Sequence, residues 1–115
     1  MIAGRPAAGI WLATAPADMR MSFDGLPALV RTRLGRDPVS GAWYVFINRR
    51  RTMMKVLAFD SGGYWIWSKR LERGLFARAG SSGPAEPLSP FGLLALIEGI
   101  DVLAARRRVR LRLAA

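Results

Sequence analysis

Residues 42–76, AWYVFINRRRTMMKVLAFDSGGYWIWSKRLERGLF, contain three apolar runs and two turn-like segments that separate them. The runs are Trp43–Ile47, Met53–Phe59 and Tyr64–Trp67, and the turn-like segments are Asn48–Arg51 and Ser61–Gly63. Short runs rich in β-branched and aromatic residues, bounded by turn residues, are typical of strands joined as hairpins. We therefore predict that this stretch folds as an antiparallel meander at the centre of a sheet.

The same stretch is strongly cationic. Its seven basic residues outnumber Asp60 and Glu72, which leaves a net charge of +5. The basic residues are Arg49, Arg50, Arg51, Lys55, Lys69, Arg70 and Arg73. A folded surface with this density of cations is typical of proteins that bind polyanions.

The loop at Ser61–Gly63 sets which side chains face each other across the second hairpin. A three-residue loop places Lys55 opposite Lys69, and a loop of only the two glycines places Lys55 opposite Arg70. Either register sets a cation opposite a cation, which disfavours pairing unless an anion lies between them. Alternatively, the long side chains diverge into water.

Length and composition indicate one folded domain with a polyanionic partner. The chain has 115 residues, is 51% hydrophobic, and carries a net charge of +10. It contains neither Cys nor His, which excludes disulfides, thiolate metal sites and the commonest general base. No apolar run reaches membrane-spanning length and no signal peptide is visible, so we expect a cytoplasmic protein, associated with the nucleoid when bound to DNA.

Two elements are expected before the hairpins. Ile10–Thr14 has the composition of a short strand. A helix is expected to follow, with Ser22 or Asp24 as its N-cap and Pro27 in its first turn. Gly35 is expected to end this helix.

After the hairpins, Leu75–Ala79 is expected to form a fourth strand of the meander, and residues 80–88 a surface loop rich in Ser, Gly and Pro. A second helix is predicted with Ser89 as its N-cap and Pro90 at its first position. Its apolar face is wide, which suits a helix packed in the core or against a partner. The chain then ends in a basic segment that includes Arg106, Arg107 and Arg108. It is expected to form a disordered tail or, because it alternates from Arg108 onwards, to add as an edge strand.

These elements predict an α+β fold. We expect a flexible N-terminus over residues 1–9, a single domain over residues 10–103, and a basic tail over residues 104–115. The sheet is expected to be an antiparallel meander of about four to five strands, with two helices packed on it.

The sequence argues against catalysis. None of its eight carboxylates has a second acid at a spacing that would hold a pair of metal ions, and Asp60 precedes a tight turn that it is expected to help form. The serines have no imidazole to activate them, and no phosphate-loop motif is present. We therefore predict that the protein is not an enzyme and uses no cofactor or metal.

The aromatic residues have two interpretations. Aromatic side chains interleaved with cations can stack on unpaired bases. However, Trp65 and Trp67 share one face of their predicted strand, as Trp43 and Ile47 share a face of theirs. A core stripe is the more frequent cause of such spacing, because a small domain must bury much apolar area.

Several blocks of the chain, in their order, resemble one protein family. They are Ile10–Thr14, Asp18–Arg20, Ser22–Leu26, Val45–Phe46, Asn48–Arg51, Lys55–Val56, Trp67–Gly74, Leu88–Ser89 and Ile97–Asp101. The chain resembles the small TnpB accessory proteins, encoded by the second open reading frame of the insertion-sequence-sixty-six family of bacterial transposable elements. It departs from the family pattern at Thr52, where an acidic residue is common, and at Ala77–Arg78, which replace Trp-Pro.

The resemblance implies participation in DNA transposition beside a separate transposase that carries the catalytic acids. We therefore predict a non-catalytic accessory protein that binds DNA and assists the transposase, with no membrane partner; self-association is left open. The expected DNA-binding residues are Arg49, Arg50, Arg51, Lys55, Lys69, Arg70, Arg73, Arg106, Arg107 and Arg108. Two alternatives are an adaptor that binds the transposase without DNA and a basic RNA-binding module.

Overall fold

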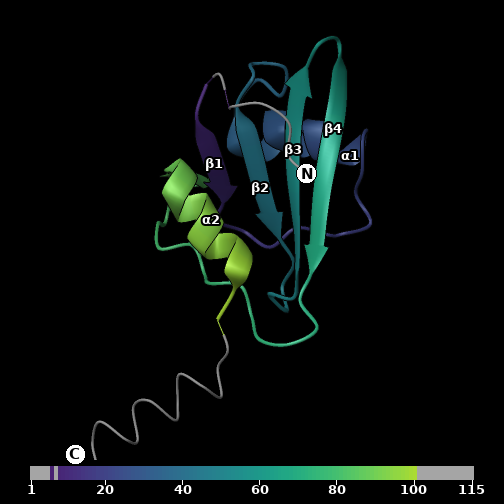
Figure 1. Ribbon diagram of the computed structural model, residues 1–115. Coiled ribbons are helices and arrows are strands. Elements are labelled where there is room, and N and C mark those ends of the chain that lie inside the picture. Colours follow the sequence, from purple (N-terminus) through teal and green to yellow (C-terminus); the bar gives the residue numbers. More distant parts are fainter. Residues whose placement is uncertain (1–5, 7, 101–115) are drawn as a thin grey trace, which may run out of the picture.

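The computed structural model describes Pro6 and residues 8–100 (Figure 1). The predicted tail with Arg106, Arg107 and Arg108, and most of the predicted flexible N-terminus, lie outside the described residues. In chain order the elements are β1 (Ile10–Ala13), α1 (Gly25–Leu29), the π-helical η1 (Val30–Leu34), β2 (Trp43–Ile47), β3 (Met53–Asp60), β4 (Gly63–Arg70), β5 (Ala85–Leu88) and α2 (Pro90–Glu98).

The five strands form one mixed sheet in the order β4-β3-β2-β1-β5. Strands β2, β3 and β4 form the predicted antiparallel meander. Strand β1, however, lies parallel to β2, so the prediction of a wholly antiparallel meander is wrong. Parallel neighbours need a crossover connection, and α1 with η1 supplies one between β1 and β2.

The fifth strand lies where a loop was expected. Ala85–Leu88 pairs antiparallel with β1, whereas Leu75–Ala79 forms no strand and contributes one isolated bridge from Leu75 to Ile100. The Thr14 N–H donates to the Pro84 carbonyl at 3.2 Å, so these two residues are a hydrogen-bonded pair. Bonded and non-bonded pairs alternate along an antiparallel ladder, and the nitrogen of Pro87 therefore points away from β1, toward the open edge. Proline is tolerated at such an edge position, which is why a Pro-rich segment serves here as a strand.

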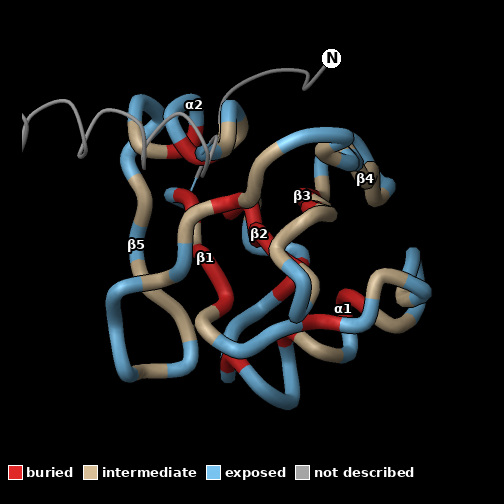
Figure 2. Tube along the Cα trace, turned by 90° about the horizontal axis from the view of Figure 1, so that it is seen from below, coloured by how far each residue is buried: buried red, intermediate tan, exposed pale blue. Residues whose placement is uncertain are grey.

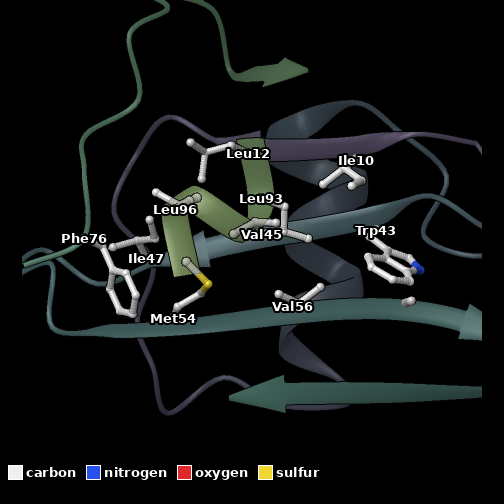
Figure 3. Packing of buried hydrophobic residues seen from close by; sticks show 11 residues of the cluster. Ile10, Leu12, Trp43, Val45, Ile47, Met54, Val56, Phe76, Leu93 and Leu96 are labelled. Atoms are coloured by element: carbon white, nitrogen blue, oxygen red, sulfur yellow. The ribbon is translucent and has the colours of Figure 1, made fainter. Parts of the chain in front are cut away.

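The two helices cover opposite faces of the sheet, as Figure 2 shows. On one face, Leu93 and Leu96 of α2 pack over Val45 and Ile47 (Figure 3). On the other, Leu26 and Val30 belong to a second buried cluster. All five residues of the central strand β2 are buried, because both of its faces are covered.

The β3–β4 hairpin has neither of the two expected registers. Its turn is Ser61–Gly62, with φ of 46° and 81°, so Asp60 pairs with Gly63. Positive φ at both central residues is the geometry of the type I′ turn, whose twist suits a hairpin. Lys55 therefore lies opposite Ser68, and the expected pairing of two cations is wrong.

The predicted helix boundaries largely agree with the structure. Asp24 is the N-cap of α1, although its side chain makes no capping hydrogen bond, and Gly35 ends η1 with φ of 62°. The Ser89 side chain accepts a hydrogen bond from the Gly92 N–H at 2.8 Å, and Pro90 follows as the first helical residue. The predicted N-cap of α2, Ser89, and the predicted end of η1, Gly35, are thus confirmed.

Candidate nucleic-acid interface

The turn between β2 and β3, residues 48–52, is held together by one asparagine. The Asn48 Oδ1 accepts hydrogen bonds from the Thr52 N–H at 2.9 Å and the Met53 N–H at 3.0 Å, and its Nδ2 donates to the Thr52 hydroxyl at 3.2 Å. The Arg51 N–H closes the turn onto the Asn48 carbonyl at 3.0 Å. We call residues 48–52 the arginine turn, because Arg49, Arg50 and Arg51 occupy its centre.

Arg49 and Arg50 are exposed at the tip of this turn. Among residues 8–100, the structure shows no hydrogen bond or ion pair from either guanidinium. Asn48 and the backbone account for the turn, and both cations remain directed at solvent. Neither arginine is needed to form the reversal, because Asn or Gly at these positions would suit a turn at least as well.

Arg51 differs from its two neighbours. It is half-buried and has a positive φ of 61°, a conformation that a residue with a Cβ rarely adopts. Its backbone carbonyl accepts a hydrogen bond from the Phe76 N–H at 2.8 Å, and its Nη1 donates to the Phe76 carbonyl at 3.4 Å. Arg51 thus fastens the segment that follows β4 to the arginine turn.

The two predicted lysines lie on opposite faces of the sheet. The Lys55 Nζ donates to the Met21 carbonyl at 2.7 Å, on the α1 side. The Lys69 Nζ donates to the Ile97 carbonyl at 2.9 Å, on the α2 side. Each half-buried lysine stabilises a chain segment outside the sheet, and the two do not form one patch.

Arg70 and Arg73 lie near the same end of the sheet as the arginine turn. Arg70 pairs with Met53 across the ladder, and the Leu71 N–H donates to the Thr52 carbonyl at 2.8 Å. Arg70 forms an exposed ion pair with Glu72 at 2.9 Å, and Arg73 is exposed. The structure therefore gathers Arg49, Arg50, Arg70 and Arg73 at one end of the hairpins.

Arg36 and Arg78 are not among the DNA-binding residues expected from the sequence. The Arg36 guanidinium carbon lies 3.3 Å from the centre of the Trp11 ring, a cation–π contact between segments that are far apart in sequence. Arg78 is exposed and, with Arg51, lines a hollow of about 150 Å³ beside the arginine turn. No sequence signal joined Arg78 to this turn, because residues 75–79 were expected to extend the meander.

The tryptophans of β4 belong to the core. Trp65 and Trp67 are half-buried against the cluster beneath α2, and the Trp43 and Trp65 rings meet edge to face with centroids 5.4 Å apart. The Trp65 Nε1 also donates to Asp60 at 3.2 Å. The core interpretation of these aromatic residues is confirmed, and Asp60 serves the hairpin.

The carboxylates of the described residues are dispersed. No three Asp or Glu side chains in this part of the chain lie close enough to hold a metal ion. Asp18 accepts hydrogen bonds from the Arg20 side chain and from the Arg20 N–H, which lower the pKa of Asp18 to about 2. No helix in the described part of the chain is long and apolar enough to cross a membrane.

Comparison with known proteins gives a consistent answer. Residues 8–107 match the family described as IS66 Orf2 like protein. The chain is 37% identical over 92 residues to the uncharacterized protein y4hO of Sinorhizobium fredii (strain NBRC 101917 / NGR234), covering 80% of each chain. It is 32% identical over 99 residues to the uncharacterized protein y4jC of the same organism, covering 86% of this chain and 85% of the relative. No solved structure matches.

Proposed function

The chain belongs to the family of IS66 Orf2-like proteins, and on that premise we propose that it binds DNA through the arginine turn and assists a separate transposase without catalysing the reaction. Membership ties the chain to transposition in an accessory role, and the family is not a known class of enzymes. DNA binding is inferred from the residues of the arginine turn, and assistance of a separate transposase from the family to which the chain belongs. Bound to DNA, the protein would be found with the nucleoid.

The observation that carries the proposal is the pair of exposed guanidinium groups at Arg49 and Arg50. They stand side by side on a turn that Asn48 already holds, and the structure gives them no partner among residues 8–100. Two adjacent like charges repel each other, and a bound polyanion would relieve that cost. Guanidinium groups also suit phosphate, because they donate paired hydrogen bonds.

A salt titration tests this proposal. Duplex DNA binding is measured at several salt concentrations for the wild type and for an Arg49→Gln/Arg50→Gln variant. If both side chains contact phosphates, the variant lowers the magnitude of the salt slope by about 1.8, because each lost contact removes about 0.9. The loss should be similar on unrelated sequences, because phosphate contacts carry no base information.

A matched control is available on η1. Arg31 and Arg33 are also exposed, and Arg31→Gln/Arg33→Gln removes the same net charge from another part of the surface. This control should leave the salt slope nearly unchanged. Equal effects of the two variants would show that only net charge matters, and an unchanged slope in the turn variant would remove the arginine turn from the interface.

A second candidate function is that of an adaptor for the transposase. Helix α2 turns Leu93 and Leu96 into the core but leaves Phe91 81% and Leu94 63% exposed. Exposed apolar side chains on one helix are typical of a protein-binding surface. If this surface contacts the transposase, Phe91→Ser/Leu94→Ser should abolish co-purification of the transposase of the same element while leaving the DNA salt slope unchanged. Single-stranded RNA in the same titration tests the RNA-binding alternative.

A further inference from the structure

A hollow of about 150 Å³ opens at the carboxyl ends of β1 and β2, the parallel pair of the sheet. Its walls come from three segments: Thr14 and its neighbours after β1, Asn48 and Arg51 after β2, and residues 77–79. The carboxyl ends of parallel strands are a frequent place for ligands, since the chain leaves neighbouring strands in different directions there.

The charge of this hollow is wholly positive. Arg51 and Arg78 line it, and no Asp or Glu is among its lining residues. The Thr14 hydroxyl is committed to the Gly83 carbonyl, and the Asn48 amide to the arginine turn. The two guanidinium groups are therefore the ionic groups available to a ligand.

Most N–H donors of the Arg51 side chain have no partner within the described part of the chain. A guanidinium has five N–H donors, and in the described part of the chain Arg51 makes one side-chain hydrogen bond, a long one of 3.4 Å to the Phe76 carbonyl. The residue is half-buried, so its remaining donors are only partly hydrated.

We propose that this hollow binds a single phosphate group between Arg51 and Arg78. The phosphate belongs either to the DNA backbone or to a free 5′ end, and both share the chemistry that two guanidinium groups recognise. This inference deepens the proposed function and rests on it, since it places one phosphate contact beneath the exposed tip of the arginine turn. It differs from that function in requiring an open hollow that holds one phosphate group, which inorganic phosphate alone would occupy.

Three variants test the hollow. Arg78→Gln removes the exposed cation, and Arg51→Gly removes the half-buried one while glycine relieves the positive φ. Arg31→Gln/Arg33→Gln removes two exposed cations on η1, outside the hollow and outside the arginine turn, and is the control. Melting temperatures are compared in sodium phosphate and in sodium chloride of equal ionic strength. Phosphate also stabilises folded proteins generally, so the specific part is the gain that the control variant keeps and the hollow variants lose.

We expect phosphate to stabilise the wild type and the control variant, and to bind Arg51→Gly and Arg78→Gln about tenfold more weakly. The absence of phosphate-specific stabilisation in the wild type would overturn the site, as would its persistence in both hollow variants. Either result leaves DNA binding by the arginine turn to be judged separately by its salt slope.

Duplexes with and without 5′-phosphates then distinguish the two sources. Tighter binding of the phosphorylated duplex by the wild type, lost in Arg78→Gln, identifies a DNA end as the ligand. Equal binding of both duplexes, with a salt slope lowered by about 0.9 in Arg78→Gln, identifies a backbone phosphate.

An independent observation concerns the free edge of β4. The Leu71 N–H bonds to the Thr52 carbonyl, which fixes the alternation along the β3–β4 ladder. The N–H and C=O groups of Tyr64, Ile66, Ser68 and Arg70 therefore point away from β3. In the described part of the chain, β4 has no neighbouring strand on that side.

The sequence of β4 suits pairing with itself. The half-buried segment 64–67 lacks the charges and prolines that protect edge strands. Antiparallel pairing of two copies about Ile66 sets Trp65 opposite Trp67 of the second copy and Lys69 opposite Gly63, so no cation faces a cation. We infer that the protein forms a homodimer through β4, which joins two sheets into one.

A single-cysteine variant tests this dimer, because the chain contains no Cys. In Ile66→Cys, two thiols would meet at the dimer axis with Cα atoms about 5.5 Å apart, a distance that a disulfide spans. Mild oxidation should cross-link this variant rapidly, whereas Ser81→Cys, on an exposed loop, should cross-link slowly.

Sedimentation provides the second measurement. Ser68→Pro removes an N–H that points away from β3, so it should shift the wild-type dimer to monomer while the β3–β4 ladder stays intact. A wild type that sediments as a monomer up to its solubility limit would overturn the dimer. So would equal cross-linking of the two cysteine variants.

Discussion

Strand β3 begins and ends at turns that are built in different ways. The arginine turn is held by side-chain hydrogen bonds from Asn48, whereas Ser61–Gly62 reverses the chain through backbone conformation, with φ of 46° and 81°. In the second turn Gly62 suits its positive φ, Ser61 takes a positive φ that a residue with a Cβ rarely adopts, and Asp60 accepts the Trp65 indole N–H.

The arginine turn also contains one residue other than Gly with a positive φ, Arg51, which ends the turn closed by its N–H on the Asn48 carbonyl, a common hairpin arrangement. Asn48 explains the reversal, but nothing in the geometry explains why Arg49 and Arg50 stand at the tip. Arg49 and Arg50, which the geometry of the turn does not need, are therefore its candidates for a functional role. Arg51 differs from them, because its backbone and side chain both bond to Phe76.

The largest effect is expected at Asn48. Asn48→Ala removes the acceptor of the Thr52 and Met53 N–H groups and should lower the free energy of unfolding by about 2–3 kcal/mol, because both donors lose their partner. Urea unfolding measures the loss. Asn48→Asp keeps the acceptor and should recover most of it; a mild effect of Asn48→Ala would mean that the turn does not depend on its asparagine.

A glycine pair tests the second turn. Gly62 has φ of 81° and Gly63 has no positive φ, and a Cβ added at either would meet no atom within 4 Å. Gly62→Ala should therefore destabilise by about 1–2 kcal/mol through backbone strain alone, and Gly63→Ala by much less. Thermal unfolding of both variants checks this difference, and equal losses would show that this turn does not depend on a left-handed residue.

Arg51 shares one feature with each turn, because it has a side-chain hydrogen bond and also a positive φ. Arg51→Ala keeps the strain and loses the hydrogen bond to Phe76, so it should cost about 1 kcal/mol. Arg51→Gly loses the same bond but relieves the strain, and should unfold close to the wild type. Denaturant midpoints decide this, and a glycine variant less stable than the alanine variant would mean that the guanidinium holds more of the fold than one hydrogen bond.

The hairpins and helix caps could be predicted because they depend on local chemistry. The runs around Val45 and Val56, the Ser89 N-cap and the Gly35 stop all follow from residues within a few positions of each element. The place of β1 could not be predicted, because four apolar residues pair equally well with several neighbours. Likewise, proline in β5 is typical of a loop from sequence alone. It fits a strand only once the structure shows that the Pro87 nitrogen faces the open edge of the sheet.

The candidate site was predictable to the same degree. Exposure of Arg49 and Arg50 follows from their place in a turn. The separation of Lys55 from Lys69 does not, since it depends on a shift of one residue in the β3–β4 register, and such a shift moves a side chain to the other face. Arg78 joined Arg51 only through tertiary structure.

The smallest expected effect concerns an arginine that does have an acid. Arg20 bonds to Asp18 at 2.6 Å on the surface, in contrast to Arg49 and Arg50. The pKa of Asp18 falls from 3.8 to about 2, first because the Arg20 side chain and then because its N–H bonds to the carboxylate. A folded pKa below the unfolded one means that the stabilisation is present above pH 4 and disappears as the pH falls toward 2.

Asp18→Asn should therefore differ slightly from the wild type at pH 7 and match it near pH 2, in low salt. Salt should erase the difference at pH 7, because exposed pairs are screened. Carboxyl chemical shifts measured by NMR across pH 1–6 give the pKa of Asp18 directly. The Arg20→Gln variant should raise it part of the way to its ordinary value, because the backbone N–H of residue 20 still bonds to the carboxylate. An ordinary pKa of Asp18 in the wild type would mean that Arg20 is as unpaired in solution as the arginines at the tip of the turn. The contrast between paired and unpaired cations would then no longer distinguish Arg49 and Arg50 from Arg20.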